Sequence, residues 1–479
     1  MLYSNVEFLI FFAVVFGLFL LADNSPRKKL WVLGLSSVFF YIWAGFGDFL
    51  IFVFVVFVSW GVVWWAEQSR FEKAKDRILL FGIVLLTVNL FFWKYSSWVV
   101  QAIQSKYPLF LYGNRIEVIL PVGVSFFTLQ GLAYLIDYRR GTVAYLSFQQ
   151  VFLTKSFFPQ LIAGPIVRMQ QLAPQLNSLN RLKSEDIQIG LAIFLLGFFK
   201  KVAIADRMGG VVDPVFNDPT AYTVGSIVLA LIAYTIQIWA DFSGYTDMGR
   251  GAARMLGVNL PENFLSPYFA KSPSEFWRRW HITLSQWIRD YIYMPMGGGR
   301  GNLVRVLFVL VITMTISGLW HGAAITFILW GLYHGFLLIM ERGFRYVSIP
   351  IYDRNYSILL MLALIMFGWL LFRAQSLDSL LFMLRAIFSW TSFGKDTVSN
   401  FAVMFGAGAC FVLHIIYYKP LVGNKRSIWN YFESKISELS IYSKPVGVLV
   451  KSILLGMFMV LTLLMRVENG GGSFIYFQF

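Results

Sequence analysis

Long apolar stretches separated by short polar segments run along the whole chain. Each stretch approaches the roughly 20 residues that an α-helix needs to cross a bilayer. The candidate membrane-spanning helices lie near residues 7–22, 30–46, 48–65, 78–98, 116–136, 187–204, 223–241, 304–320, 322–341, 356–373, 400–418 and 446–465. Because a segment in lipid must satisfy its own backbone hydrogen bonds, this pattern predicts an all-α integral membrane protein with about 11–12 spans.

Three parts of the chain depart from this pattern. The apolar stretches 151–166 and 378–390 are too short to span and suit re-entrant or interfacial segments. Residues 242–303 form the longest region without a clear span, and they lead into the glycine-rich apolar segment 318–335. Because the spans are spread evenly, we predict a single membrane domain over residues 1–479.

The region 242–303 contains one strong helix signal, in the stretch "SPSEFWRRWHITLSQWIRDYIYMP". Ser272 can cap the helix, Pro273 suits its first position, and Glu275 completes a capping box. On a continuous helix one face carries Trp277, Trp280, His281, Leu284, Trp287, Ile288 and Tyr291, and the other carries Arg278, Ser285, Gln286, Arg289 and Asp290. The sequence therefore predicts one amphipathic helix along the membrane interface or over the mouth of a cavity.

The charge pattern predicts an orientation in the membrane. Only 14% of the residues are charged and 58% are hydrophobic, and the net charge is +15. Lys and Arg cluster at 24–29, 69–77 and 137–141, whereas the turn 44–48 has none. The positive-inside rule then places these basic loops and the region 242–303 in the cytoplasm, and the N-terminus outside.

The excess of positive charge also bears on partners. Basic residues next to spans contact anionic lipid headgroups, so membrane lipids are the expected partner. Nucleic acid is not, because the basic residues are scattered over loops and form no recognisable binding module.

The single cysteine and the N-terminal sequence limit which kinds of site and of targeting segment this protein can have. The one cysteine, Cys410, excludes an internal disulfide, a cysteine zinc cluster and an iron–sulfur centre, and it reads as a packing residue. The first apolar stretch has no Lys or Arg before it, so we expect a retained first helix rather than a signal peptide.

The four histidines are the candidates for chemistry, because an ionisable residue at membrane depth is a functional candidate. His414 lies in the wholly apolar run "CFVLHIIYY" and is expected to be structural. His321 lies between Gly318 and Gly322, which permit close approach of a backbone or a ligand, and its imidazole could act as a general base. His334 follows 13 positions later, about 220° around a continuous helix, so the two histidines form a metal pair only if that helix breaks.

The sequence motifs of several other catalytic mechanisms are absent from the chain. Neither His281 nor His321 has an aspartate five residues later, and the chain has no GxSxG elbow and no GxxxxGK[ST] loop. An enzyme of this kind would use histidine with direct transfer from a bound donor.

Two further placements of charged residues are unusual. Arg373 lies beside an apolar run, and the segment from Asp241 through Asp247 to Arg250 either pairs internally or lines a polar vestibule.

The stretches "FWRRWHITLSQWIRDYIYMPMGG" (276–298) and "GLWHGAAITFILWGLYHG" (318–335) resemble the membrane-bound O-acyltransferase (MBOAT) family, in particular its alginate O-acetyltransferase branch. Supporting matches lie at 119–141, 157–166, 234–258, 367–376 and 474–479, in the expected order. The resemblance implies spans and re-entrant helices around a central tunnel, with His321 as the essential catalytic residue and His281 helping to bind or orient the donor. It also implies substrate-binding roles for Trp320, Arg278, Arg279, Trp280, Arg289 and Asp290. Arg300 lies near the same group.

The same resemblance implies a reaction and a location. Acetyl would pass from cytoplasmic acetyl-CoA, near His321, to a hydroxyl arriving from the outer side, and so toward the hydroxyls of an exported, alginate-like polysaccharide. No permanently bound cofactor and no metal are expected. The expected partners are a periplasmic or extracellular acetyltransferase and polysaccharide synthesis machinery, with the protein in the bacterial inner membrane. One departure is the turn "MGGGRGN" (296–302), where relatives often carry an Asn-Arg pair.

Two alternatives remain open from sequence. One is a D-alanyl transfer protein for teichoic acids, which would use a carrier-protein thioester. The other is a non-enzymatic polysaccharide or lipid transporter. Transporters often contain internal repeats, and the motif 276–298 has no counterpart elsewhere in the chain.

Overall fold

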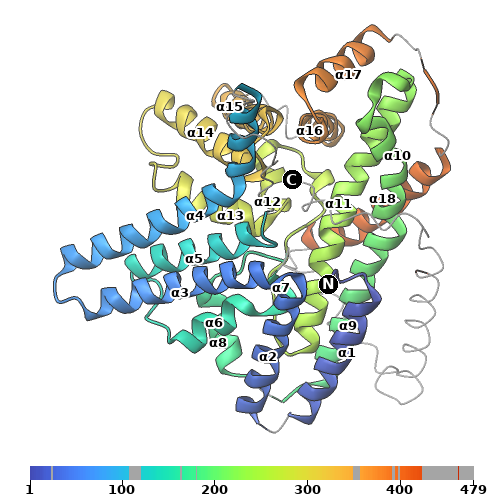
Figure 1. Cartoon of the computed structure of the whole chain (residues 1–479). Coiled ribbons are helices and arrows are strands. Elements are labelled where there is room, and N and C mark those ends of the chain that lie inside the picture. The colour runs from blue at the N-terminus through green and yellow to red at the C-terminus, as the bar shows by residue number, and fades with distance from the viewer. Residues whose placement is uncertain are drawn as a thin grey trace. The chain divides into compact units, whose positions relative to one another are not determined.

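Helices make up almost all of the regular secondary structure among the described residues (Figure 1). The computed structural model describes residues 1–22, 25–106, 120–161, 164–179, 181–348, 356–390, 394–396, 400–422 and 462. Within these residues no strand forms, and the only bridge is an isolated one between Tyr222 and Lys395. The predicted all-α class is confirmed.

Five segments among the described residues are long and apolar enough to cross a membrane. They are Phe46–Gln68, Glu72–Val100, Ser184–Asn217, Val224–Met255 and Leu303–His321. Shorter apolar helices cover Val6–Leu21, Ser357–Arg373 and Asn400–Ile416. The predicted spans at 30–46 and 322–341 fall on helices Pro26–Ala44 and Ile325–Tyr346. The predicted span 446–465 lies outside the described residues except for position 462, as do positions 116–119 and the terminal motif 474–479.

The chain divides into two compact units. One consists of Met1–Gly190 with Gly249–Pro261, and the other of Leu191–Met248 with Glu262–Phe479. The residues predicted from the sequence to be catalytic or to bind substrate all belong to the second unit.

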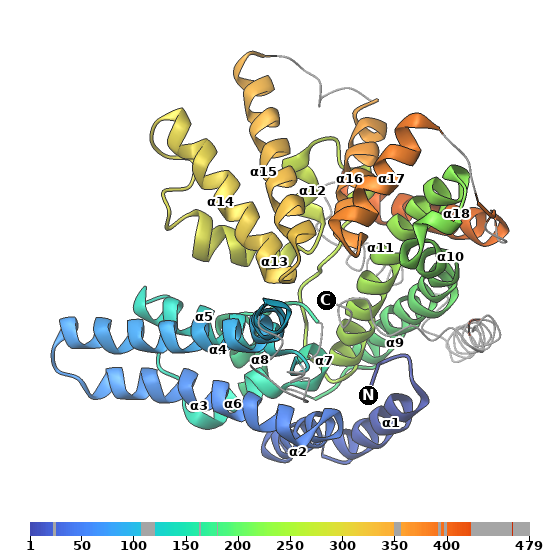
Figure 2. The same cartoon turned by 45° about the horizontal axis from the view of Figure 1, so that its top comes forward.

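The first unit is a layer of helices that includes α1 (Val6–Leu21), α2 (Pro26–Ala44), α3 (Phe46–Gln68), α4 (Glu72–Lys106), α5 (Val124–Arg139), α6 (Phe148–Ser156), α7 (Phe158–Leu161) and α8 (Met169–Asn177). Helices α3, α4 and α5 lie side by side (Figure 2). The short apolar stretch predicted at 151–166 falls on α6 and α7, which are separate helices on either side of Phe157. On α6 the buried Lys155 ammonium donates a hydrogen bond to the Ser59 hydroxyl at 2.9 Å.

The second unit begins within α9 (Ser184–Phe199), which continues through a π-helical turn (Lys200–Ala205) into α10 (Asp206–Asn217). Adjacent lysines in that turn form buried ion pairs with α11 (Val224–Met255). Lys200 lies 2.7 Å from Asp247, and Lys201 lies 2.8 Å from both Asp241 and Asp206. Asp241 and Asp247 thus pair with lysines of another segment, which neither of the two predictions for the segment from Asp241 to Arg250 had stated. Buried charges require such partners, because an isolated buried ion is strongly destabilising.

The helices that hold the candidate site follow. They are α12 (Pro273–Arg279), α13 (Ile282–Ile288), a π-helical turn (Arg289–Tyr293), α14 (Leu303–His321), α15 (Ile325–Tyr346), α16 (Ser357–Arg373), α17 (Leu377–Ser389) and α18 (Asn400–Val422). Helices α14 and α15 are packed neighbours, and α16 packs against α15 (Figure 2). The short apolar stretch 378–390 falls on α17, one face of which is buried.

Candidate functional site

His321 is the last residue of α14, at a break between two helices. Gly322 is fully extended (φ −179°, ψ 175°), and helix resumes only at Ile325. A methyl group on Gly322 would lie 2.5 Å from the Phe327 ring, so glycine at this position lets that ring fold back over the break. The imidazole of His321 is buried, with the residue 6% exposed.

Glycines bring the two helices on either side of this break into backbone contact. A methyl group on Gly318 would collide with the carbonyl oxygen of Phe327, and one on Gly331 would lie 2.5 Å from that of Met314. The close approach expected at Gly318 is therefore an approach of the α15 backbone. Its effect is to fix the end of α14, and with it His321, against α15.

Aromatic rings surround the His321 imidazole. Its ring centroid lies 4.8 Å from Trp320, 5.1 Å from Trp330, 5.0 Å from Phe372 and 6.3 Å from Phe327. Three of these four contacts are edge-on, which is a favoured arrangement for aromatic pairs. The rings restrict the orientation of the imidazole and exclude bulk water from it.

The break also brings His334 toward the same cluster. Trp330 packs edge-on against His321 and against His334, whose centroid lies 4.8 Å away. The separation of about 220° holds only for a continuous helix, and the structure interrupts that helix at Gly322. On α16, a methyl group at Gly368 would lie 2.8 Å from Nε2 of His334, so this glycine makes room for the imidazole. In the described part of the chain no cluster of His, Cys, Asp and Glu could hold a metal.

The predicted continuous helix over 272–295 is wrong, because it breaks at His281. Helix α12 ends at Arg279 and α13 begins at Ile282, while His281 adopts the left-handed conformation (φ 42°, ψ 54°). The start is as predicted, with Pro273 in the first turn and Ser272 capping the backbone N–H of Glu275. The Glu275 carboxylate instead accepts from the backbone N–H of Lys271 at 2.7 Å, so the capping box is not closed.

The break turns the His281 side chain into a buried aromatic environment. The residue is 1% exposed, and its ring lies 4.7 Å from Phe242 and 6.2 Å from Trp320. Burial lowers the pKa of His281 to about 3, so the imidazole is neutral at physiological pH. Trp320 thus contacts both His281 and His321, the two histidines predicted to be catalytic.

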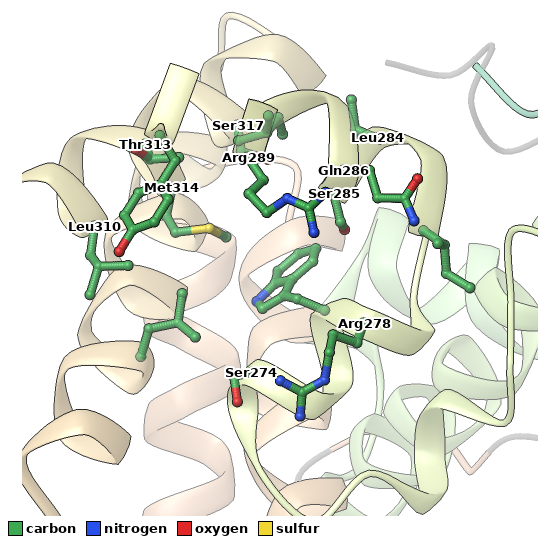
Figure 3. A pocket seen from close by; sticks show the side chains of 15 residues that line it. Ser274, Arg278, Leu284, Ser285, Gln286, Arg289, Leu310, Thr313, Met314 and Ser317 are labelled. Atoms are coloured by element: carbon green, nitrogen blue, oxygen red, sulfur yellow. The ribbon is translucent and has the colours of Figure 1, made fainter. Parts of the chain in front are cut away.

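A cavity of about 460 Å³ lies between the α12–α13 segment and α14. We call it the Arg278 cavity. It is lined by Ser274, Trp277, Arg278, Ile282, Leu284, Ser285, Gln286, Ile288, Arg289, Tyr293, Leu310, Thr313, Met314, Ser317 and Leu338. Figure 3 shows Arg278 and Arg289 with the residues that α14 contributes on the other side.

The α14 side of this cavity leads to His321. Leu310, Thr313, Met314 and Ser317 recur at the spacing of one helical face, and His321 follows Ser317 after one further turn. The lining covers about 10 Å along the helix axis. This face was not predicted from the sequence, although Thr313, Ser317 and His321 recur at four-residue intervals in an apolar helix and so gave a usable signal.

The other residues predicted to bind substrate lie in different surroundings. Arg279 does not line the Arg278 cavity, and its guanidinium pairs with Glu275 at 2.6 Å. Trp280 is 2% exposed, packed against Phe264 and Trp369. Asp290 pairs with Arg289 at 2.8 Å, next to the cavity. Substrate roles for these residues stay predictions.

A second cavity, of about 570 Å³, is lined in part by the residues that directly follow His321 in the chain. We call it the Arg373 cavity. It is lined by Asp213, Asn217, Gly322, Ala323, Ala324, Thr326, Phe327, Phe372, Arg373, Ala374 and Gln375. Arg373, which stood out in the sequence, pairs here with Asp213 at 3.0 Å. Along the chain, His321 therefore stands between Ser317, which lines the Arg278 cavity one turn earlier, and Gly322, which lines the Arg373 cavity directly after it. His321 itself belongs to neither lining.

His414 lies apart from both cavity linings. Its Nδ1 is 2.8 Å from the Cys410 carbonyl oxygen, and its ring stacks on Tyr268 at 5.2 Å. Cys410 is buried beside it. This packing agrees with the structural role predicted for His414 and with the packing role predicted for Cys410.

Comparison with known proteins assigns the family. The sequence model of the membrane-bound O-acyltransferase family matches residues 141–384, just over half of the chain and including both cavities. The probable alginate O-acetylase of Azotobacter vinelandii is 38% identical over 405 residues, which cover 83% of this chain and 79% of that protein. The peptidoglycan O-acetyltransferase of Helicobacter pylori is 34% identical over 76% of this chain and 75% of its own length.

A more distant relative is a D-alanyl transfer protein, the class of enzyme that the sequence left open as an alternative. The teichoic acid D-alanyltransferase of Bacillus subtilis is 28% identical, over 47% of this chain and 59% of its own length. From the family match and the extensive identity to O-acetylating relatives, we conclude that the chain belongs to the membrane-bound O-acyltransferase family and is an O-acyltransferase.

Proposed function

We propose that this enzyme transfers acetyl from cytoplasmic acetyl-CoA across the membrane to hydroxyl groups of an exported polysaccharide. The observation that carries the proposal is that the α14 face lining the Arg278 cavity reaches His321 after one further turn, and that Gly322, directly after His321, lines the Arg373 cavity. The relatives named as alginate O-acetylase and peptidoglycan O-acetyltransferase support acetyl as the group and a cell-envelope glycan as the final acceptor.

The Arg278 cavity is the proposed donor site. Arg278 and Arg289 offer guanidinium groups to the phosphates of CoA, with which arginine forms bidentate hydrogen bonds. The apolar lining of α14 suits the pantetheine arm, and Thr313 and Ser317 lead toward His321. His281, neutral and buried beside Trp320, would help to orient the thioester from the other side of that indole.

The proposed reaction needs one general base. His321 takes the proton from the acceptor hydroxyl while the hydroxyl oxygen bonds to the thioester carbonyl carbon. The tetrahedral intermediate then collapses, the C–S bond breaks, and the proton passes from the imidazole to the leaving thiolate. The products are the acetyl ester and free CoA. The aromatic rings around His321 disfavour hydrolysis because they exclude water.

The wider setting follows from the orientation proposed for the chain. With the N-terminus outside and the loops 24–29, 69–77 and 137–141 in the cytoplasm of a bacterial inner membrane, the donor would enter from the cytoplasmic side. A periplasmic or extracellular acetyltransferase would then carry acetyl to the polysaccharide made by the neighbouring synthesis machinery.

A second candidate is D-alanyl transfer to teichoic acid from a carrier-protein thioester. The similarity to the Bacillus subtilis teichoic acid D-alanyltransferase favours keeping it as an alternative. A carrier protein would present only a phosphopantetheine arm, whereas acetyl-CoA adds the adenosine phosphates that both arginines could bind. The transporter alternative is not carried further, because the chain is an O-acyltransferase.

Reconstitution tests the proposal. The full chain in lipid vesicles, supplied with acetyl-CoA labelled in the acetyl group, should release CoA and form an alkali-labile acetyl ester. His321→Ala should abolish both products at an unchanged level of folded protein, and His281→Ala should weaken use of the donor. Normal transfer by His321→Ala would contradict the assignment. Use of a D-alanyl carrier protein but not acetyl-CoA would favour the second candidate.

A further inference from the structure

A buried carboxylate outside the Arg278 cavity binds a residue of its lining. Glu341 lies on α15, and its side chain is 5% exposed. Its Oε2 accepts a hydrogen bond from the backbone N–H of Ser274, and its Oε1 accepts one from the Ser274 hydroxyl, both at 2.7 Å. Oε1 also pairs with the guanidinium of the exposed Arg345 at 3.0 Å. Both oxygens of the carboxylate thus bind one residue of another helix.

The residue that Glu341 binds lies in the first turn of α12, a helix of only seven residues. A helix this short has little stability of its own, so its position depends on contacts with the rest of the fold. The backbone N–H of Ser274 is one of the amides for which the start of a helix offers no internal partner, and Glu341 accepts from it. Because the carboxylate binds a backbone atom and a side-chain atom of the same residue, it restricts both the place and the rotation of α12.

The face of α12 that Glu341 holds is the face that lines the Arg278 cavity. Ser274, Trp277 and Arg278 all belong to the lining, and residues three and four positions apart lie on one side of a helix. Figure 3 shows Ser274 and Arg278 on this short helix. A shift at Ser274 would therefore displace the Arg278 guanidinium, to which the proposed function assigns the phosphates of CoA.

The helix that holds α12 also holds His321. On α15, Trp330 packs edge-on against His321 at 5.1 Å and against Trp277 of α12 at 5.6 Å. Glu341 lies on the same face of α15 as Trp330, about three turns further along the helix. These two contacts hold α12 at separate points, so α15 supports both the wall of the donor cavity and the proposed general base.

We propose that Glu341 is a positioning residue of the donor site, because its contact with Ser274 sets α12 so that Arg278 meets the phosphates of the donor. This inference rests on the proposed function and adds to its donor site a residue that lies outside the cavity lining. Loss of the contact should weaken binding of a donor that has phosphates and leave the chemical step at His321 unchanged.

Kinetics with two donors test the inference. Glu341→Leu removes both acceptor oxygens at a similar side-chain size, and it should raise KM for acetyl-CoA about fivefold with little change in kcat. KM for S-acetyl pantetheine, which lacks the phosphates, should stay unchanged. Glu341→Gln should keep KM within about twofold of the wild type, because its amide can accept from the Ser274 N–H and donate to the Ser274 hydroxyl.

A matched control and a double variant separate this role from a general loss of stability. Arg345→Gln removes the exposed partner of the same carboxylate and leaves both bonds to Ser274, so KM should stay within about twofold of the wild type. Adding Glu341→Leu to Arg278→Gln should raise KM no further than Arg278→Gln does alone. If Glu341→Leu fails to fold, Glu341→Asp should show the same rise for acetyl-CoA only, because its side chain keeps the charge but is one methylene shorter.

The possible outcomes distinguish this inference from the proposed function. An equal loss with both donors, a rise in Arg345→Gln or Glu341→Gln as large as that in Glu341→Leu, or multiplied effects in the double variant would overturn the inference. So would a raised KM in Arg278→Gln beside an unchanged KM in Glu341→Leu and Glu341→Asp, while the donor site itself would stand. An unchanged KM for acetyl-CoA in Arg278→Gln would overturn the donor site of the proposed function and this inference with it.

Discussion

Trp330 packs edge-on against His321, with ring centroids 5.1 Å apart. The same indole packs edge-on against His334 at 4.8 Å, and the residue is 1% exposed. One buried side chain thus holds the proposed general base on one side and a second histidine on the other. The position of the His321 imidazole is set by packing from α15 as well as by its own helix.

Shortening this indole should reduce activity more than it reduces folding. Trp330→Phe retains an aromatic ring but leaves a gap beside His321, so we expect a loss in kcat of about tenfold or more. Trp330→Ala should also destabilise the protein by about 3–5 kcal/mol, the usual range for removing a buried large aromatic side chain. Thermal unfolding and steady-state rates of both variants check this. Full activity in Trp330→Ala would show that the indole does not position the histidine.

Gly318→Ala should separate α14 from α15. The added methyl group would collide with the carbonyl oxygen of Phe327, which is backbone and cannot rotate away. We expect lower thermal stability together with lower kcat, since His321 lies one turn away. Gly343→Ala on α15 is the matched control, because a methyl group there meets no atom within 4 Å. If the two variants behave alike, the close contact at Gly318 has no role in the site.

If the arginines of the Arg278 cavity bind the phosphates of the donor, the effect of replacing them should depend on whether the donor has phosphates. Arg278→Gln and Arg289→Gln should each raise KM for acetyl-CoA by about tenfold, with little change in kcat. The same variants should use S-acetyl pantetheine, which lacks phosphates, as well as the wild type does. Arg385→Gln, an exposed change on α17 outside the cavity lining, provides the control. An equal loss with both donors would place the arginines in a structural role.

Burial of His281 should make stability depend on pH. Its pKa is about 3 in the folded chain and about 6.5 in an unfolded one, so between these values the unfolded state binds more protons. The contribution of His281 is therefore complete above pH 6.5 and falls as pH drops, by at most about 1.4 kcal/mol per pH unit. Thermal unfolding from pH 7 to 4.5 should fall less steeply in His281→Gln than in the wild type. Parallel curves would contradict a neutral, buried His281.

The ion pairs of the π-helical turn predict a loss of stability without a specific loss of chemistry. Lys201→Met leaves Asp241 and Asp206 without their shared cation, and it should cost about 3–5 kcal/mol, the usual range for breaking a buried pair. Adding Asp241→Asn to that variant should restore part of the loss, because it removes one uncompensated charge. Unfolding of the single and double variants measures the difference. A double variant less stable than Lys201→Met would show that charge balance is not what these pairs supply.

The sequence by itself determined the helical class, the places of most apolar helices and the start of α12 at Ser272 and Pro273, and it singled out His281 and His321 as candidates. Each of these depends on residues near one another in the chain: an apolar stretch of spanning length, a cap, a histidine between glycines. The family motifs also lie within single segments, so the order of residues along the chain is enough to recognise them.

Only the tertiary structure decided how these segments meet. It broke the predicted helix at His281 and placed Trp330 between His321 and His334. It paired Arg373 with Asp213, which lies 160 positions earlier in the chain. It also showed that the α14 face containing Thr313 and Ser317 forms the wall of a cavity. Helical periodicity assumes that a helix continues, and it says nothing about which distant side chain fills the space next to it. Whether a helix breaks, and which distant side chain packs next to it, depend on packing between helices. These two features give the buried His321 its surroundings.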